Sequence, residues 1–198
     1  QALKSRAFWH VSFAHMCDVL VAVAVSTHIM PYLSSINIPR STSSLVASAI
    51  ALAGVLGRLS FGWLGDRYDK RWVTAIGFAI TIPGLLLLGY IDALGAWLLV
   101  PFVFLFGVGW GGPVPLFPAL MLDYFGRVRL GTILGLSLGV IMIGNMSGPP
   151  LAGWVFDSFG SYQTAWFAAA IIIIIGIVSL ITAPSVDSLR RKANRQEN

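Results

Sequence analysis

Charged residues are scarce in this chain. Lys, Arg, Asp and Glu make up 11% of its 198 residues, and 57% are hydrophobic, whereas about a quarter of a soluble domain is charged. A chain of this length could not hide so much apolar surface in a core of its own, so lipid must cover much of it. The composition therefore excludes an ordinary soluble domain and predicts an all-α polytopic membrane protein.

Cysteine is almost absent. Cys17 is the only one in the sequence, which excludes a disulfide framework and a cysteine-built zinc site. We expect no metal and no bound cofactor. The first residue is Gln1 and not Met, so we expect a fragment of a longer chain. Further long apolar runs follow the first one, which argues against a cleavable signal peptide.

Long apolar runs dominate what remains. An α-helix rises about 1.5 Å per residue, so a run of about 20 residues can cross a bilayer. We predict six such helices in residues 1–184, followed by a basic tail at residues 185–198. The predicted spans are 8–34, 41–65, 72–91, 97–122, 130–156 and 163–183.

The basic residues predict the orientation of these spans. With the amino terminus in the cytoplasm, Arg40 is the only Lys or Arg outside, and the inner side receives eleven. These are Lys4, Arg6, Arg67, Lys70, Arg71, Arg127, Arg129, Arg190, Arg191, Lys192 and Arg195. This positive-inside bias predicts two cytoplasmic termini in a plasma or inner membrane. It also accounts for the net charge of +5 without a nucleic-acid partner.

A short charged segment separates the second and third predicted spans. It reads Gly62-Trp63-Leu64-Gly65-Asp66-Arg67-Tyr68-Asp69-Lys70-Arg71. The pattern resembles the signature loop of the major facilitator superfamily of secondary transporters, although Asp69 replaces its usual Gly. The resemblance implies a gating role for Gly62, Asp66, Arg67 and Arg71 at the inner helix ends. The plainer alternative is a positive-inside anchor.

Two further segments indicate which half of such a transporter this is. Residues 2–9 resemble the start of the seventh helix, and residues 148–154 resemble the corner between the eleventh and twelfth helices. The resemblance implies the carboxy-terminal six-helix half, with an amino-terminal half as its missing partner. The substrate site of this fold lies between the two halves near the bilayer midplane.

Arg58 is the leading candidate for binding substrate. It lies eight residues before Asp66, about 12 Å inside the membrane, where an unpaired guanidinium costs at least ~2.5–3.5 kcal/mol. Residues 57–63 resemble the eighth helix of oxalate:formate antiporters and monocarboxylate transporters, in which an arginine holds the substrate carboxylate. The alternative is a structural arginine that snorkels or caps a helix.

Two departures from these relatives narrow the expected cargo. The predicted span 130–156 has no cationic residue, whereas the oxalate transporters have a lysine there. Gly54 stands where the monocarboxylate transporters have an aspartate, four residues before the arginine. Because one cation neutralises one carboxylate, we expect an organic anion, and a monocarboxylate rather than a dicarboxylate.

His15 and Asp18 are candidates for proton coupling. They are three residues apart and share a helix face, and Asp18 lies at a depth close to that of Arg58. Histidine titrates near pH 6.5, and a buried carboxyl group can be brought toward that range. The alternative is that Asp18 simply neutralises Arg58 while His15 hydrogen-bonds a helix backbone.

Four other features also receive a predicted role. His28 is a candidate for an outer gate, Trp110 for covering the apolar body of a substrate, and Asn145 for a polar contact with it. The glycines and prolines of residues 107–118 predict a bend in the fourth span, because carbonyls freed from a helix are tolerated beside a cavity or protein.

The fifth span contains glycine at every fourth position, at Gly131, Gly135 and Gly139, with Gly144 and Gly148 beyond. This spacing predicts close approach to another helix. Residues 135–139 also match G-x-S-x-G, but the hydrolase motif needs a strand-turn-helix context that a membrane span does not provide. We therefore expect no enzyme. Two alternatives stay open: a transporter of neutral or cationic cargo, and a non-transporting membrane sensor or half-length protein that dimerises.

Overall fold

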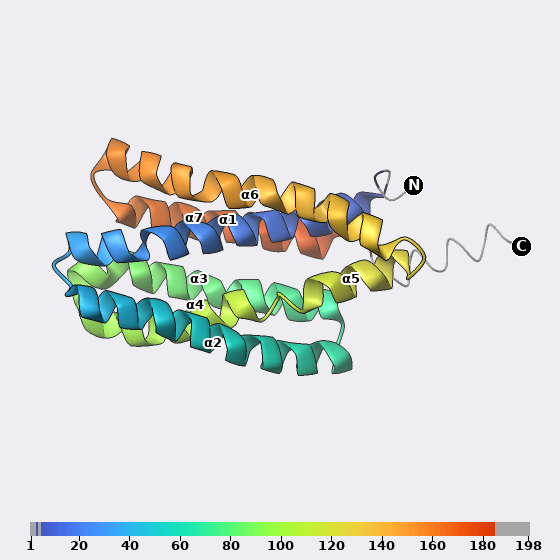
Figure 1. Ribbon diagram of the computed structural model, residues 1–198, viewed down its shortest axis with the longest axis horizontal. Helices are drawn as coiled ribbons and strands as arrows, with labels where there is room; N and C mark the ends of the chain where they lie inside the picture. Colours follow the sequence, from blue (N-terminus) through green and yellow to red (C-terminus); the bar gives the residue numbers. More distant parts are fainter. Residues whose placement is uncertain (1–2, 4, 185–198) are drawn as a thin grey trace, which may run out of the picture.

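The computed structural model describes Leu3 and residues 5–184, and the predicted tail at 185–198 lies outside them. The helices run side by side along one axis (Figure 1). In order they are α1 (Arg6–Ser35), α2 (Arg40–Arg67), α3 (Lys70–Leu94), the short 3₁₀ helix η2 (Ala96–Leu98), α4 (Leu99–Gly111), α5 (Leu116–Phe125), α6 (Leu130–Phe159) and α7 (Tyr162–Thr182). They form six segments long and apolar enough to cross a membrane, which confirms the predicted all-α polytopic class.

Local sequence determines where several helices begin and end. The Asp69 carboxylate accepts a hydrogen bond from the Arg71 backbone N–H at 2.9 Å and so caps α3, and Ser161 caps α7 in the same way. An unpaired N–H at a helix start needs such an acceptor. Gly160 ends α6 in the left-handed conformation, with a φ of 67°, which glycine adopts without strain.

The fourth span is interrupted where glycines and prolines predicted a bend. Residues 112–115 form turns between α4 and α5, and Leu116 N–H bonds to the Pro113 carbonyl at 3.0 Å. Pro113 and Pro115 have no N–H to donate to the preceding turn of α4, and two glycines, Gly111 and Gly112, come directly before them. This combination interrupts the helix here, whereas α6 continues through Pro149 and Pro150. The short α5 therefore leaves the axis of α4, as Figure 1 shows.

The core of the bundle lies between α1, α3, α4 and α7. Helix α1 packs mainly against α6 and α7, and α3 packs against α4 and α7. Phe8, Phe78, Phe102, Phe106 and Trp166 are completely buried there. In contrast, large apolar side chains such as Leu52, Val100 and Met146 are 69–76% exposed. Apolar surface of this extent needs lipid or another protein segment to cover it.

The glycines of α6 divide into two groups. Gly144 and Gly148 lie against the backbone carbonyls of Met16 and Leu20 in α1, where a Cβ would not fit. Gly131, Gly135 and Gly139 face open space, with nothing within 4 Å of an added Cβ. The close helix approach that the glycine spacing predicted is therefore made by Gly144 and Gly148, and no described helix packs on Gly131, Gly135 and Gly139.

Candidate functional site

Arg58 lies on an exposed face of α2. Its neighbour Gly57 packs against α4, where a Cβ would lie 2.5 Å from the Val108 carbonyl oxygen, while the Arg58 side chain points out of the bundle. Among the described residues Arg58 has no ion-pair partner. A guanidinium inside a membrane span needs water, an anion or another protein group beside it, and the described residues provide no ion-pair partner on this face.

Trp110 lies close to the same part of α2. Gly54 is one helical turn before Arg58, and a Cβ added to Gly54 would lie 3.8 Å from the Trp110 ring. Trp110 itself is half-buried. The Gly54 position therefore brings the aromatic ring of α4 and the cation of α2 to neighbouring places on one side of the bundle.

His15 and Asp18 point into the bundle and not toward Arg58. Each is 4% exposed. The His15 ring lies edge-on to Phe117 and Phe78, with centroids 4.7 and 5.5 Å apart, and His15 Nε2 is buried without a hydrogen-bond partner in the described part of the chain. Asp18 and Arg58 form no ion pair in this structure, so the predicted alternative in which Asp18 neutralises Arg58 is not observed in this conformation.

A serine pair extends this buried polar face of α1. Ser12 lies three residues before His15 and donates to Ser137 of α6 at 3.0 Å. Ser137 in turn contacts the Met121 sulfur of α5 at 3.8 Å. Sequence reasoning assigned no role to Ser12, because a serine in a membrane helix gives no local sign of a partner 125 residues away. Ser12, His15 and Asp18 thus form one buried polar row.

His28 connects three helices at the end of the bundle that carries the α1–α2 connection, here called the α1–α2 end. Its Nε2 lies 3.0 Å from the Pro149 carbonyl of α6, and its Nδ1 lies 3.0 Å from the Tyr162 hydroxyl of α7. A carbonyl only accepts, so Nε2 must donate, and in the neutral ring Nδ1 accepts from Tyr162. Asn145 lies one turn before Pro149 and is half-buried.

The signature loop lies at the opposite end, here called the α2–α3 end. Arg71 donates to the Ala183 carbonyl at 2.6 Å and so binds the end of α7. Arg67 lies over the Trp63 ring, with its guanidinium carbon 3.9 Å from the ring centroid, and Asp66 is exposed. Gly62 has open space beside it. Of these four residues, Arg71 makes the contact between helices.

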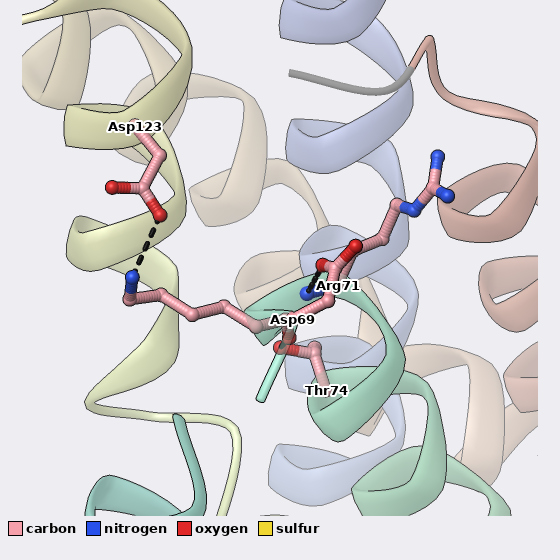
Figure 2. A network of polar contacts seen from close by, with 5 residues as sticks. Asp69, Arg71, Thr74 and Asp123 are labelled. Carbon is pink, nitrogen blue, oxygen red and sulfur yellow. Dashed lines mark hydrogen bonds and ion pairs between the residues drawn. The ribbon is translucent and has the colours of Figure 1, made fainter. Parts of the chain in front are cut away.

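An ion pair that the sequence did not indicate lies beside this loop. Lys70 Nζ lies 2.7 Å from Asp123 Oδ2, so the start of α3 is joined to the end of α5. Figure 2 shows Asp123 on one side of this network and the Arg71 guanidinium pointing away from it. The Tyr124 hydroxyl also donates to the Pro184 carbonyl at 2.9 Å. Contacts from α3 and α5 therefore converge on the end of α7.

The Lys70–Asp123 pair should contribute modestly to stability. Its side chains are 26% and 35% exposed, and partly exposed pairs are worth about 0.5–1 kcal/mol. We expect a double-mutant cycle of Lys70→Ala and Asp123→Ala, followed by thermal unfolding in detergent, to give a coupling energy in this range. The exchanged pair Lys70→Asp with Asp123→Lys should recover part of the loss. A coupling energy of zero would show that the pair is incidental.

Comparison with known proteins shows which class of membrane protein has this arrangement of six helices. A sequence profile of the Major Facilitator Superfamily matches residues 11–198. Two solved structures have the same fold: a proton-dependent oligopeptide transporter (TM-score 0.79, 16% identity, 91% of this chain and 42% of that chain) and the E. coli fucose:proton symporter (TM-score 0.75, 17% identity, 90% and 43%). The six helices are thus those of a polytopic transporter fold.

Curated proteins with similar sequences are also named as transporters. Monocarboxylate transporter 12 of Rattus norvegicus is 28% identical over 167 residues, which cover 83% of this chain and 34% of the relative. The Homo sapiens protein of the same name is 29% identical over 196 residues, covering 91% and 37%. The chain belongs to the major facilitator superfamily. It spans about a third of the length of these relatives.

Proposed function

We propose that this chain is the carboxy-terminal six-helix half of a secondary transporter that moves a small monocarboxylate by alternating access. The observation that carries the proposal is Arg58, an unpaired cation of the described bundle that lies within a span on a face not covered by its own helices. A guanidinium binds a carboxylate through two parallel hydrogen bonds. Such transport requires no covalent change in the cargo.

We assign the second side of the substrate pathway, opposite the helices described here, to an amino-terminal six-helix half. Relatives named monocarboxylate transporters are about three times as long as the matched segment, and in this fold the substrate site lies between two halves. The exposed glycines of α6 and the exposed face of α2 provide surface for such a partner. Trp110 would cover the apolar body of the substrate, and Asn145 would supply a polar contact.

The α2–α3 end is assigned to the cytoplasm of a plasma or inner membrane, because it carries six of the eight Lys and Arg residues that the structure describes. Arg71, with Asp66, Arg67 and Gly62, would form the inner gate. Arg71 binds the end of α7 through one charge-assisted hydrogen bond, which can form and break without entering lipid. His28, bonded to α6 and α7, would take the corresponding place at the outer gate.

The experiment is uptake by proteoliposomes containing the protein expressed from its intact reading frame. The panel consists of labelled monocarboxylates, dicarboxylates, a sugar and an organic cation. We expect monocarboxylates to be taken up best, because a second carboxylate would lack a cation. Faster uptake of dicarboxylates would contradict the one-cation argument. Uptake of only the sugar or the organic cation would replace the proposal with neutral or cationic transport.

Proton coupling through Asp18, with His15 beside it, is the second part of the proposal. A gradient of one pH unit is worth about 1.4 kcal/mol per proton, which can accumulate a co-transported anion about tenfold. We expect the wild type to reach this accumulation under an inwardly directed proton gradient. In Asp18→Asn we expect the substrate to equilibrate across the membrane without accumulation. Steady-state content of labelled substrate measures both.

Two controls accompany that comparison. Asp157→Asn removes a carboxylate from the exposed end of α6 and should accumulate substrate like the wild type. Liposomes without protein correct for diffusion of the uncharged acid across the bilayer. If Asp18→Asn still accumulates substrate tenfold, another group carries the proton and Asp18 is structural.

A further inference from the structure

A pocket opens at the α1–α2 end beside the only basic residue assigned to the outer side. It has a volume of about 310 Å³ and is lined by Met30, Pro31, Ser34, Arg40 and Ser43. Arg40 is exposed, and within the described part of the chain it has no ion-pair partner. The first turn of α2 contains no acidic side chain. The pocket is thus a small cavity beside an exposed arginine that has no acidic side chain in its lining, although Asp92 lies at the same end in a neighbouring pocket with Ser35.

Arg40 and Arg58 lie on the same face of α2. They are 18 residues apart in one continuous helix, which is five turns at about 3.6 residues per turn and about 27 Å along the axis. The exposed residues between them on this side include the small residues Ser44, Ser48 and Ala51, and Val55, which is 47% exposed. The two arginines therefore lie at the ends of one strip of mostly small residues, whose two serines lie in the half next to Arg40.

An apolar strip runs beside it. Leu45, Leu52, Leu56 and Leu59 are 56–70% exposed and lie about a quarter to half a turn around the helix from the arginines. The unburied surface of α2 is therefore divided into a leucine side suited to lipid or an apolar partner and an arginine side suited to water and anions. This division indicates that the two arginines border one aqueous route.

We propose that the Arg40 pocket is a capture site for the carboxylate that Arg58 binds farther along the helix. The inference rests on the proposed function, since it takes the cargo from it. An exposed cation in a hollow raises the local concentration of anions and speeds their entry, and salt screens this effect. Arg40 binds the anion weakly and transiently, whereas Arg58 holds it within the membrane.

The test probes the pocket without relying on transport. Ser34, an exposed wall residue, is replaced in Ser34→Cys, and its reaction with an anionic and a cationic thiol reagent is followed by site-resolved mass spectrometry. One unit charge about 6 Å away in water changes a local concentration about threefold. We expect Arg40→Gln in this background to slow the anionic reagent about threefold, and a soluble monocarboxylate to protect the site when Arg40 is present.

Four comparisons decide the outcome. Arg127→Gln removes an exposed arginine at the opposite end and should leave the labelling unchanged, and high salt should abolish the difference made by Arg40. Equal labelling with and without Arg40 would overturn the proposal. Protection that follows the anionic lipid content and not the soluble monocarboxylate would overturn it in favour of a lipid headgroup site.

Uptake measured in parallel separates this inference from the proposed function. If Arg40 forms a capture site, Arg40→Gln should reduce monocarboxylate influx about threefold at low salt. Arg58→Ala should abolish uptake but leave the labelling of Ser34→Cys unchanged. Protection of the Ser34→Cys variant in a protein that transports no carboxylate would support an anion site and refute the transport proposal. Normal influx and labelling in Arg40→Gln would refute the capture site alone.

Discussion

Replacing Arg58 with alanine should reduce monocarboxylate uptake about 100-fold. A bidentate contact between guanidinium and carboxylate in a site shielded from water contributes about 3 kcal/mol, and this is lost with the side chain. Arg58→Lys should retain part of the activity, reduced about tenfold, because lysine keeps the charge but not the planar fork. Initial rates of uptake into proteoliposomes over a range of substrate concentrations measure both variants.

The result depends on a folding control, because Gly57 next to Arg58 packs tightly against α4. The melting temperature of Arg58→Ala in detergent should match that of the wild type, since the side chain is exposed. Arg127→Ala provides a matched loss of one arginine outside the spans and should leave uptake unchanged. Undiminished carboxylate uptake in a folded Arg58→Ala protein would make Arg58 a structural residue.

The main features of the fold could be predicted because a bilayer leaves few alternatives. A helix satisfies its own backbone groups in lipid, so each long apolar run had to be helical. The interruption at residues 112–115 could also be predicted, because glycines and prolines are concentrated in residues 107–118 and both weaken a helix. The helix limits were less certain, since helices continue into polar residues such as Arg6 and Lys70 at their ends.

The contacts of the candidate site could be predicted less well. Sequence places His15 and Asp18 on one face of α1, but it does not say which neighbour that face meets. In the structure this face meets the interior of the bundle, where Phe78 and Phe117 pack against His15. The Lys70–Asp123 pair joins residues 53 positions apart, and only the packing of α5 against α3 brings them together.

Gly111→Val should lower the stability of the bundle far more than a glycine-to-valine substitution on the exposed face of α6. Helices α2 and α4 cross in contact here: a Cβ on Gly111 would lie 2.5 Å from Gly54 Cα and 2.7 Å from its carbonyl carbon. Backbone atoms cannot move aside as a flexible side chain can, so the two helices must separate. We expect Gly111→Val to cost about 3 kcal/mol and to lower the melting temperature by roughly 6–12 °C.

Gly139→Val is the matched control, because nothing lies within 4 Å of a Cβ at that position. Both substitutions place the same β-branched side chain in a membrane helix. Gly111 is the last residue of α4 and Gly139 lies inside α6, and the main difference between them is the neighbour that the side chain meets. In the six-helix chain alone Gly139→Val should melt within about 0.5 kcal/mol of the wild type, the range of ordinary surface substitutions. Equal melting temperatures for the two variants would show that α2 and α4 do not pack through Gly54 and Gly111. A loss of uptake in Gly139→Val without a loss of stability would place the amino-terminal half against the glycine face of α6.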